Sequence, residues 1–108
     1  MRVLFDHGTP APLQSFLKAE HTVREAKAQG WDRLKNGDLL TAAEEARFDV
    51  LLTSDKNMRC QQNLTGRRIA IVVLGNPQWP VLRHHVALVV AAVNAATPGS
   101  YTEVNIPE

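Results

Sequence analysis

Residues 69–74 read Ile-Ala-Ile-Val-Val-Leu, an apolar run in which polar and apolar positions do not alternate. Such a run is typical of a strand inside a parallel sheet, because helices cover both faces of that kind of sheet. The turn-forming residues Gly75-Asn76-Pro77 end the run. This stretch therefore predicts an α/β protein built on a mostly parallel sheet.

Four further strand-like runs lie before and after this one, and helical patterns separate them. The strands are expected at residues 2–5, 21–26, 49–55 and 101–106, and the helices at residues 13–17, from residue 36, at 58–64 and at 80–96. This alternation predicts one domain over residues 1–108, with a five-stranded open sheet and right-handed crossovers. A flavodoxin-like strand order would place the first and third strands side by side.

The composition is that of an ordinary globular chain: 44% of the 108 residues are hydrophobic, 21% are charged, and the formal net charge is +1. No stretch reaches the roughly 20 apolar residues that a membrane-spanning helix needs. The acid at position 6 comes too early for a signal peptide and Cys60 has no disulfide partner, so we expect a cytoplasmic protein. Because the net charge is small, any grip on a polynucleotide must come from a local basic rim.

Three aspartates are expected at one edge of this sheet. Asp6 ends the first strand and Asp55 ends the third, while Asp38 lies in the first turn of the helix that follows the second strand. In open α/β sheets the ligand site lies beyond the carboxyl ends of the strands, where the strand order reverses. If the first and third strands are neighbours, Asp6 and Asp55 converge across about 5 Å, one strand spacing. The sequence therefore predicts a cluster of three carboxylates there.

Carboxylates that cluster repel one another, so such a group normally either raises a pKa or holds a cation. Hard oxygen ligands at an open site suit Mg²⁺ or Mn²⁺, which can activate a water on a phosphodiester as nucleases do. Each acid alone also has a structural interpretation: Asp6 as a solvated turn residue, Asp38 as a helix-start residue, and Asp55 as part of a cap. Glu44 and Glu45, two turns down the middle helix, are expected to be solvated.

Three segments of the chain resemble the short PIN-like proteins, which are reduced relatives of the VapC ribonuclease toxins. The segments are residues 3–6 (Val-Leu-Phe-Asp), 36–40 (Asn-Gly-Asp-Leu-Leu) and 50–57 (Val-Leu-Leu-Thr-Ser-Asp-Lys-Asn). The match covers most of the chain in order and spacing, and the run Leu-Thr-Ser-Asp-Lys is its most specific part. The resemblance implies a three-layer α/β/α PIN-like fold and a metal-dependent endoribonuclease that cleaves single-stranded RNA.

By position, the resemblance makes Asp6, Asp38 and Asp55 the catalytic residues and the ligands of Mg²⁺ or Mn²⁺. It also implies a place as the toxin of a toxin–antitoxin pair, and hence an antitoxin protein as partner. Four residues beside the acids are candidates for binding the substrate RNA: Lys35, Lys56, Asn57 and Arg59. The basic residues among them also have an interpretation as surface charges that offset the carboxylates.

Two positions depart from the family pattern, in which a second acid often follows the first and another lies two residues after the Thr-x-Asp aspartate. Here they hold His7 and Asn57, which remove negative charge but can hydrogen-bond a water or a phosphate. The alternative function is therefore a PIN-like binding module that is catalytically weak or inactive. A phosphoacceptor receiver domain shares the architecture, but its acidic pair at the first strand and its Lys at the end of the fifth are missing here.

Residues 80–96 predict one long helix that is apolar over a wide arc. After Arg83-His84-His85 the segment carries no charged residue before Thr97. One side must cover the sheet and the other is too apolar to face water, so we expect it to be buried in a homodimer or under a partner chain. The alternative is that the last strand and its loops cover this side within the monomer.

Overall fold

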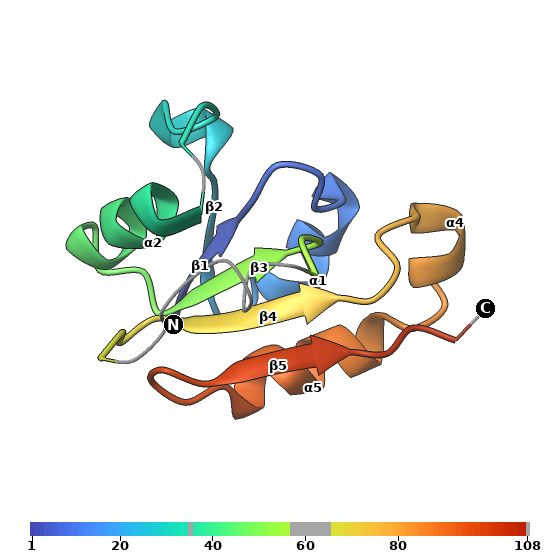
Figure 1. Ribbon diagram of the computed structural model, residues 1–108. Helices are drawn as coiled ribbons and strands as arrows, with labels where there is room; N and C mark the ends of the chain where they lie inside the picture. Colours follow the sequence, from blue (N-terminus) through green and yellow to red (C-terminus); the bar gives the residue numbers. More distant parts are fainter. Residues whose placement is uncertain (35, 57–65, 108) are drawn as a thin grey trace.

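The computed structural model describes residues 1–34, 36–56 and 66–107, and its centre is one sheet of five parallel strands (Figure 1). The strands are β1 (Arg2–Phe5), β2 (Thr22–Glu25), β3 (Val50–Thr53), β4 (Ala70–Leu74) and β5 (Tyr101–Val104). Their order across the sheet is β2-β1-β3-β4-β5, and every neighbouring pair is parallel. The expected α/β class and the five strands are therefore confirmed.

β1 and β3 are direct neighbours, as the flavodoxin-like order requires. In their parallel register Val3 pairs with Val50 and Phe5 with Leu52. The hydrogen bonding continues one residue beyond β1, because the Asp6 backbone N–H donates to the Leu52 carbonyl at 3.0 Å. The residues that follow β1 and β3 therefore begin at the same edge of the sheet.

Helices cover both faces of the sheet. On one face lie α1 (Gln14–Leu17), α4 (Trp79–Leu82) and α5 (Val86–Ala95), and on the other lies α2 (Asn36–Glu45) (Figure 1). Two short 3₁₀ helices, η1 (Ala11–Leu13) and η2 (Lys27–Gln29), complete the described elements. None of the described helices combines the length and the apolar character that crossing a membrane requires. The helix expected over residues 58–64 lies outside the described residues.

Alternate residues of the strands feed the two helical layers. In β1, Val3 and Phe5 pack into the core on the α5 side, and Leu4 between them packs into the core under α2. β3 and β4 are buried at every position, as their unbroken apolar runs predict. Burial of one Leu or Ile side chain contributes roughly 1.5–3 kcal/mol, so β3 and β4 are firmly anchored in the core. The residues that follow these strands at the carboxyl edge of the sheet are therefore held in a fixed position.

The single long helix expected over residues 80–96 is wrong, since the segment forms two helices, α4 and α5. Residues 83–85 connect them, and His85 leaves the helical region with φ −129° and ψ 23°. The backbone N–H groups of His84 and His85 bond to carbonyls three residues earlier, the pattern of a tightened helix end. Because the chain changes direction there, Leu82 of α4 and Val86 of α5 are both buried in the same core.

Candidate functional site

Asp6 stands at the carboxyl end of β1, where two hydrogen bonds orient its side chain. Its Oδ1 accepts the backbone N–H of His7 and its Oδ2 accepts the hydroxyl of Thr53, each at 2.8 Å. Both donors are uncharged, and among the described residues no basic side chain forms an ion pair with Asp6. Since each carboxylate oxygen has two lone pairs, both oxygens can accept a further partner. The carboxylate is therefore held in place without being neutralised.

Thr53 joins the ends of the two neighbouring strands. Of the polar residues in the described part of the chain, it is the one that is fully buried, with an exposed fraction of 0%. Its hydroxyl donates to Asp6 Oδ2 and accepts the backbone N–H of Asp55 at 3.1 Å. A single hydroxyl thus fixes one aspartate through its side chain and the other through its main chain. Sequence analysis missed this role, although a threonine that ends an otherwise apolar strand is a signal for it.

The loop after β1 packs onto the end of β3. The Thr9 hydroxyl donates to the Leu52 carbonyl at 2.9 Å, and the Thr9 backbone N–H donates to the Asp6 carbonyl at 3.1 Å. Gly8 has a φ of +89°, and a Cβ at this position would come within 3.3 Å of the Ser54 Oγ. The positive φ therefore favours glycine at this position, and a larger residue would also require a small shift of the Ser54 side chain.

Asp38 is exposed and lies in the first turn of α2. The helix is fixed to the sheet by Leu39, Leu40 and Ala43, which are buried in the core under α2. Its last turn lies at the amino edge of the sheet, because Glu44 there pairs with Arg67, a residue that precedes β4. The same Arg67 guanidinium also reaches the Gly37 carbonyl in the first turn of α2, at 3.5 Å, so this contact does not place Asp38 at the edge where β1 and β3 end.

Oxygen ligands at this carboxyl edge match the donor chemistry of Mg²⁺ and Mn²⁺. Within residues 1–34, 36–56 and 66–107, no three His, Cys, Asp or Glu side chains are close enough together to form a ready-made metal cage. Mg²⁺ does not require one, because it commonly binds one or two protein carboxylates and completes its shell with waters and substrate phosphates. The Asp6 carboxylate fits such a metal, and the addition of Asp55 and Asp38 stays a prediction.

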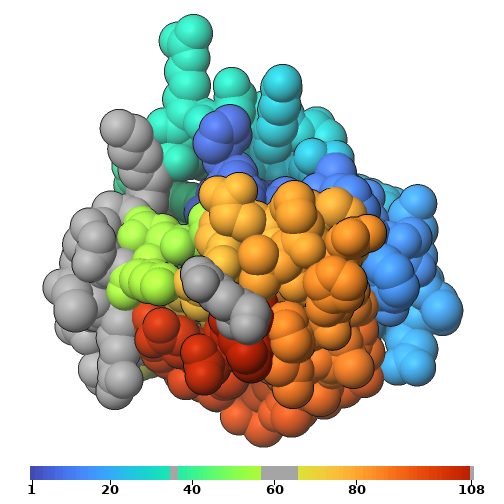
Figure 2. Space-filling view, turned by 90° about the vertical axis from the view of Figure 1, so that its right-hand side faces the viewer, coloured from blue at the N-terminus to red at the C-terminus, as the bar shows by residue number. Residues whose placement is uncertain are grey.

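Figure 2 looks onto this edge, where the segments that follow β1 (blue), β3 (lime green) and β4 (yellow to orange) meet on one face. Lys56 is exposed in the turn directly after Asp55, so it is open to an approaching phosphate. The other candidate RNA contacts, Lys35, Asn57 and Arg59, lie outside the described residues. The basic rim expected from the sequence is thus represented in the described part by Lys56.

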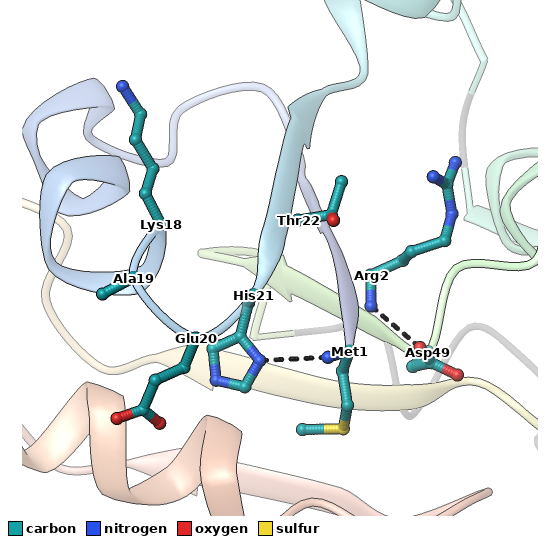
Figure 3. A pocket seen from close by; sticks show the side chains of 8 residues that line it. All are labelled: Met1, Arg2, Lys18, Ala19, Glu20, His21, Thr22 and Asp49. Carbon is teal, nitrogen blue, oxygen red and sulfur yellow. Dashed lines mark hydrogen bonds between the residues drawn. The ribbon is translucent and has the colours of Figure 1, made fainter.

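The opposite, amino edge of the sheet carries a cavity of about 430 Å³ that sequence analysis did not predict (Figure 3). Its lining is Met1, Arg2, Lys18, Ala19, Glu20, His21, Thr22 and Asp49. The Arg2 backbone N–H donates to Asp49 Oδ2 at 2.8 Å, and the Arg2 guanidinium lies 4.5 Å from the centre of the Phe48 ring. The lining of this cavity therefore mixes basic and acidic residues.

Glu44 is the second acid of the amino edge with a defined set of partners. Its Oε1 accepts the Arg67 guanidinium at 2.6 Å, and its Oε2 accepts the Arg68 backbone N–H at 2.7 Å. Burial acts to raise the pKa of Glu44, but the hydrogen bonds from Arg67 and Arg68 outweigh it, so the pKa lies below its ordinary value. The expectation that Glu44 is merely solvated is wrong, whereas Glu45 is exposed as expected.

Comparisons of the chain with models of protein families, with curated proteins and with solved structures found no match.

Proposed function

We propose that this chain is a metal-dependent endoribonuclease of PIN-like type, in which Asp6, Asp38 and Asp55 hold Mg²⁺ or Mn²⁺. The observation that carries the proposal is the placement of Asp6 and Asp55 at the ends of adjacent parallel strands, joined through the Thr53 hydroxyl. An Asp6 carboxylate whose partners in the described part of the chain are neutral donors is a ready ligand for a cation. The helices on both faces of the sheet are compatible with the three-layer PIN-like fold.

The chemistry follows from what these residues can do at an open edge. A bound Mg²⁺ or Mn²⁺ supplies charge stabilisation and lowers the pKa of a water. The Thr53 hydroxyl holds the Asp6 carboxylate in one orientation. This carboxylate therefore loses no further conformational freedom when the metal and the substrate bind. The exposed Lys56 then offers an ammonium to a phosphate of the substrate, and His7 offers ring nitrogens to a water or a phosphate oxygen.

Single-stranded RNA is the substrate that we propose, with the active site facing the solvent at the carboxyl edge. The support is the resemblance of residues 50–57 to PIN-like ribonucleases together with the basic residues Lys35, Lys56 and Arg59 around the acids. On the same grounds we propose a cytoplasmic location, where such RNA lies, and an antitoxin protein as the natural inhibitor.

A catalytically weak or inactive PIN-like binding module is the second candidate function. It is favoured by His7 and Asn57, which stand where the family often has two more acids. It is also favoured by the lack of a three-ligand group in the described part of the chain. The two candidates differ in a measurable way, because the binding module would hold Mn²⁺ weakly and leave RNA intact.

The test compares the wild-type chain with Asp55→Asn in Mn²⁺-dependent cleavage of a labelled single-stranded RNA. We expect the activity of the variant to fall by at least about 100-fold. Loss of a residue that only hydrogen-bonds a metal ligand already costs about 10–100-fold, and Asp55→Asn removes a charged ligand itself. Glu103→Gln, on the exposed edge strand β5, is the control and should keep full activity.

The outcomes separate the candidates. Cleavage by wild type that survives in Asp55→Asn would refute the assignment of the active site. A pure wild-type preparation that neither binds Mn²⁺ in calorimetry nor cleaves RNA would leave the binding module as the better function.

A further inference from the structure

The outer face of α5 is apolar and open to solvent. Leu88 is 45% exposed, and Phe16 of the neighbouring α1 is 52% exposed. None of the ten residues of α5 is charged. A groove of about 510 Å³ runs between the two helices, lined by Phe16, Val86, Ala87, Val90, Ala91 and Asn94. A face of this kind on a small chain is typical of an interface with another protein surface.

Charged residues flank this face at its two ends, and their signs are opposite. Arg83 is exposed just before α5 begins. Glu20 is exposed beside the last turn of α5, because the next residue, His21, is hydrogen-bonded to Asn94 at 2.7 Å between Nε2 and Oδ1. In Figure 3 the Glu20 carboxylate points toward α5, whereas the Lys18 ammonium points away from it.

The two charged ends also lie on the same side of α5. α4, which Arg83 follows directly, contacts α1 through Trp79 and Phe16, whose ring centres are 6.4 Å apart. α1 in turn leads to Glu20 and lies along the groove beside α5. Along this side of the face, a positive charge therefore stands at the beginning of α5 and a negative charge at its end.

We propose that a second copy of this chain covers the face, with the two α5 helices antiparallel about a two-fold axis near Ala91. The antiparallel arrangement places Arg83 of each copy against Glu20 of the other, so that two opposite-charge pairs close the ends of the interface. A parallel arrangement about a two-fold axis along the helices would put the charged residues of the two copies on opposite sides of the interface, so neither pair would form. The exposed alanines Ala87 and Ala91 leave room for the close approach of two helix backbones.

The contact between the two α5 helices is short, which limits the affinity of the dimer. A ten-residue helix is about 15 Å long, so two such helices with their flanking residues form an interface at the small end of the specific range. We therefore expect a reversible dimer with a dissociation constant in the micromolar range. This inference does not depend on the proposed nuclease activity.

Sedimentation velocity of the whole chain across the micromolar range gives the first test. Wild type should shift from monomer to dimer as its concentration rises, and Ala91→Glu should stay monomeric, because two carboxylates would meet at the two-fold axis. Ala28→Glu, at an exposed alanine of η2 on the other side of the molecule, is the matched control and should dimerise as wild type does. A wild-type chain that remains monomeric at the highest concentration would overturn the proposal, even if it binds some other protein.

Charge reversal tests the antiparallel geometry itself. Arg83→Glu and Glu20→Arg should each weaken dimerisation about 10-fold, since each converts two attractive pairs into repulsive ones. The double variant should recover wild-type association, because the pairs are restored with their signs exchanged. Failure of the double variant to recover, with circular dichroism showing that all variants are folded, would exclude this arrangement.

Discussion

The two edges of the sheet hold their acidic residues in different ways. At the amino edge, Glu44 pairs with Arg67 at 2.6 Å, and Asp49 accepts the backbone N–H of Arg2. At the carboxyl edge, Asp6 accepts one hydroxyl and one backbone N–H, and none of the described basic side chains pairs with it. Among the described residues, the amino edge thus carries the Glu44–Arg67 ion pair, whereas Asp6 at the carboxyl edge has uncharged hydrogen-bond donors.

This difference separates acids that stabilise the fold from acids that are open to a ligand. A carboxylate in close contact with a guanidinium contributes to folding and gains little from an added metal ion. A carboxylate oriented by neutral donors keeps its charge at the surface, where a cation can reach it. We therefore expect added metal to act on the carboxyl edge, and acid pH to act on the Glu44 pair at the amino edge.

The largest expected effect comes from removing one acid at each edge in turn. Asp6→Asn should lower Mn²⁺ affinity by at least about 10-fold and RNA cleavage by more, because it removes a charged ligand. Asp49→Asn is the matched change at the amino edge and should leave both quantities as in wild type. Calorimetric titration measures the Mn²⁺ affinity. If Asp6→Asn and Asp49→Asn lowered this affinity equally, the two edges would not differ in metal binding.

Thr53→Val tests the link between the two strand ends. The substitution keeps the shape of the side chain but removes both hydrogen bonds of the hydroxyl, leaving the partly buried N–H of Asp55 without this acceptor. We expect the free energy of unfolding to fall by about 1–3 kcal/mol in urea titrations, together with weaker Mn²⁺ binding. Thr53→Ser keeps the hydroxyl and should retain the Mn²⁺ affinity, although the lost methyl lowers stability. Thr22→Val, at an exposed threonine of β2, should change stability by less than about 0.5 kcal/mol.

Much of the fold was predictable because the strands are short apolar runs closed by turn residues. Residues 69–74 are buried throughout, as a run without alternation requires. The adjacency of β1 and β3 followed from topology, since parallel strands with covered faces leave few strand orders, and the convergence of the Asp6 and Asp55 carboxylates stays a prediction. Secondary structure and the edge of the candidate site were therefore accessible from the local pattern.

The rest depends on contacts between residues that are distant in the chain. Residues 83–85 contain neither Gly nor Pro, so the break between α4 and α5 arises from the packing of both helices against one core. The partner of Glu44 is Arg67, 23 residues away. The hydroxyl of Thr53 reaches Asp6 across 47 residues. No local pattern reports such pairings, which is why the sequence did not predict the partner of Glu44 or the role of Thr53.

The lowered pKa of Glu44 predicts a specific pH dependence of stability. A carboxyl whose folded pKa lies below its unfolded pKa stabilises the fold fully above the unfolded value, and that stabilisation is lost as pH falls through the folded one. Between about pH 6 and pH 3, wild type should lose up to about 1 kcal/mol more unfolding free energy than Glu44→Gln. Urea unfolding at several pH values measures the difference, and Glu45→Gln should behave as wild type. Parallel pH curves for wild type and Glu44→Gln would show that the Arg67 pair does not hold in solution.

The smallest expected effect concerns the end of α2 at the same amino edge. Arg47 has a φ of +66°, a conformation that costs an L-residue about 1–2 kcal/mol and glycine almost nothing. The strain is maintained because the N–H of Phe48 reaches the Ala43 carbonyl at 2.9 Å, which closes the helix in the manner of a Schellman motif. Arg47→Gly should therefore raise the free energy of unfolding by about 0.5–1 kcal/mol, since the greater freedom of glycine in the unfolded chain offsets part of the gain. Arg47→Ala removes the same charge but keeps the backbone penalty, so it should leave stability nearly unchanged. An equal gain in both variants would assign the effect to the guanidinium, and a gain in neither would mean that α2 ends differently in solution.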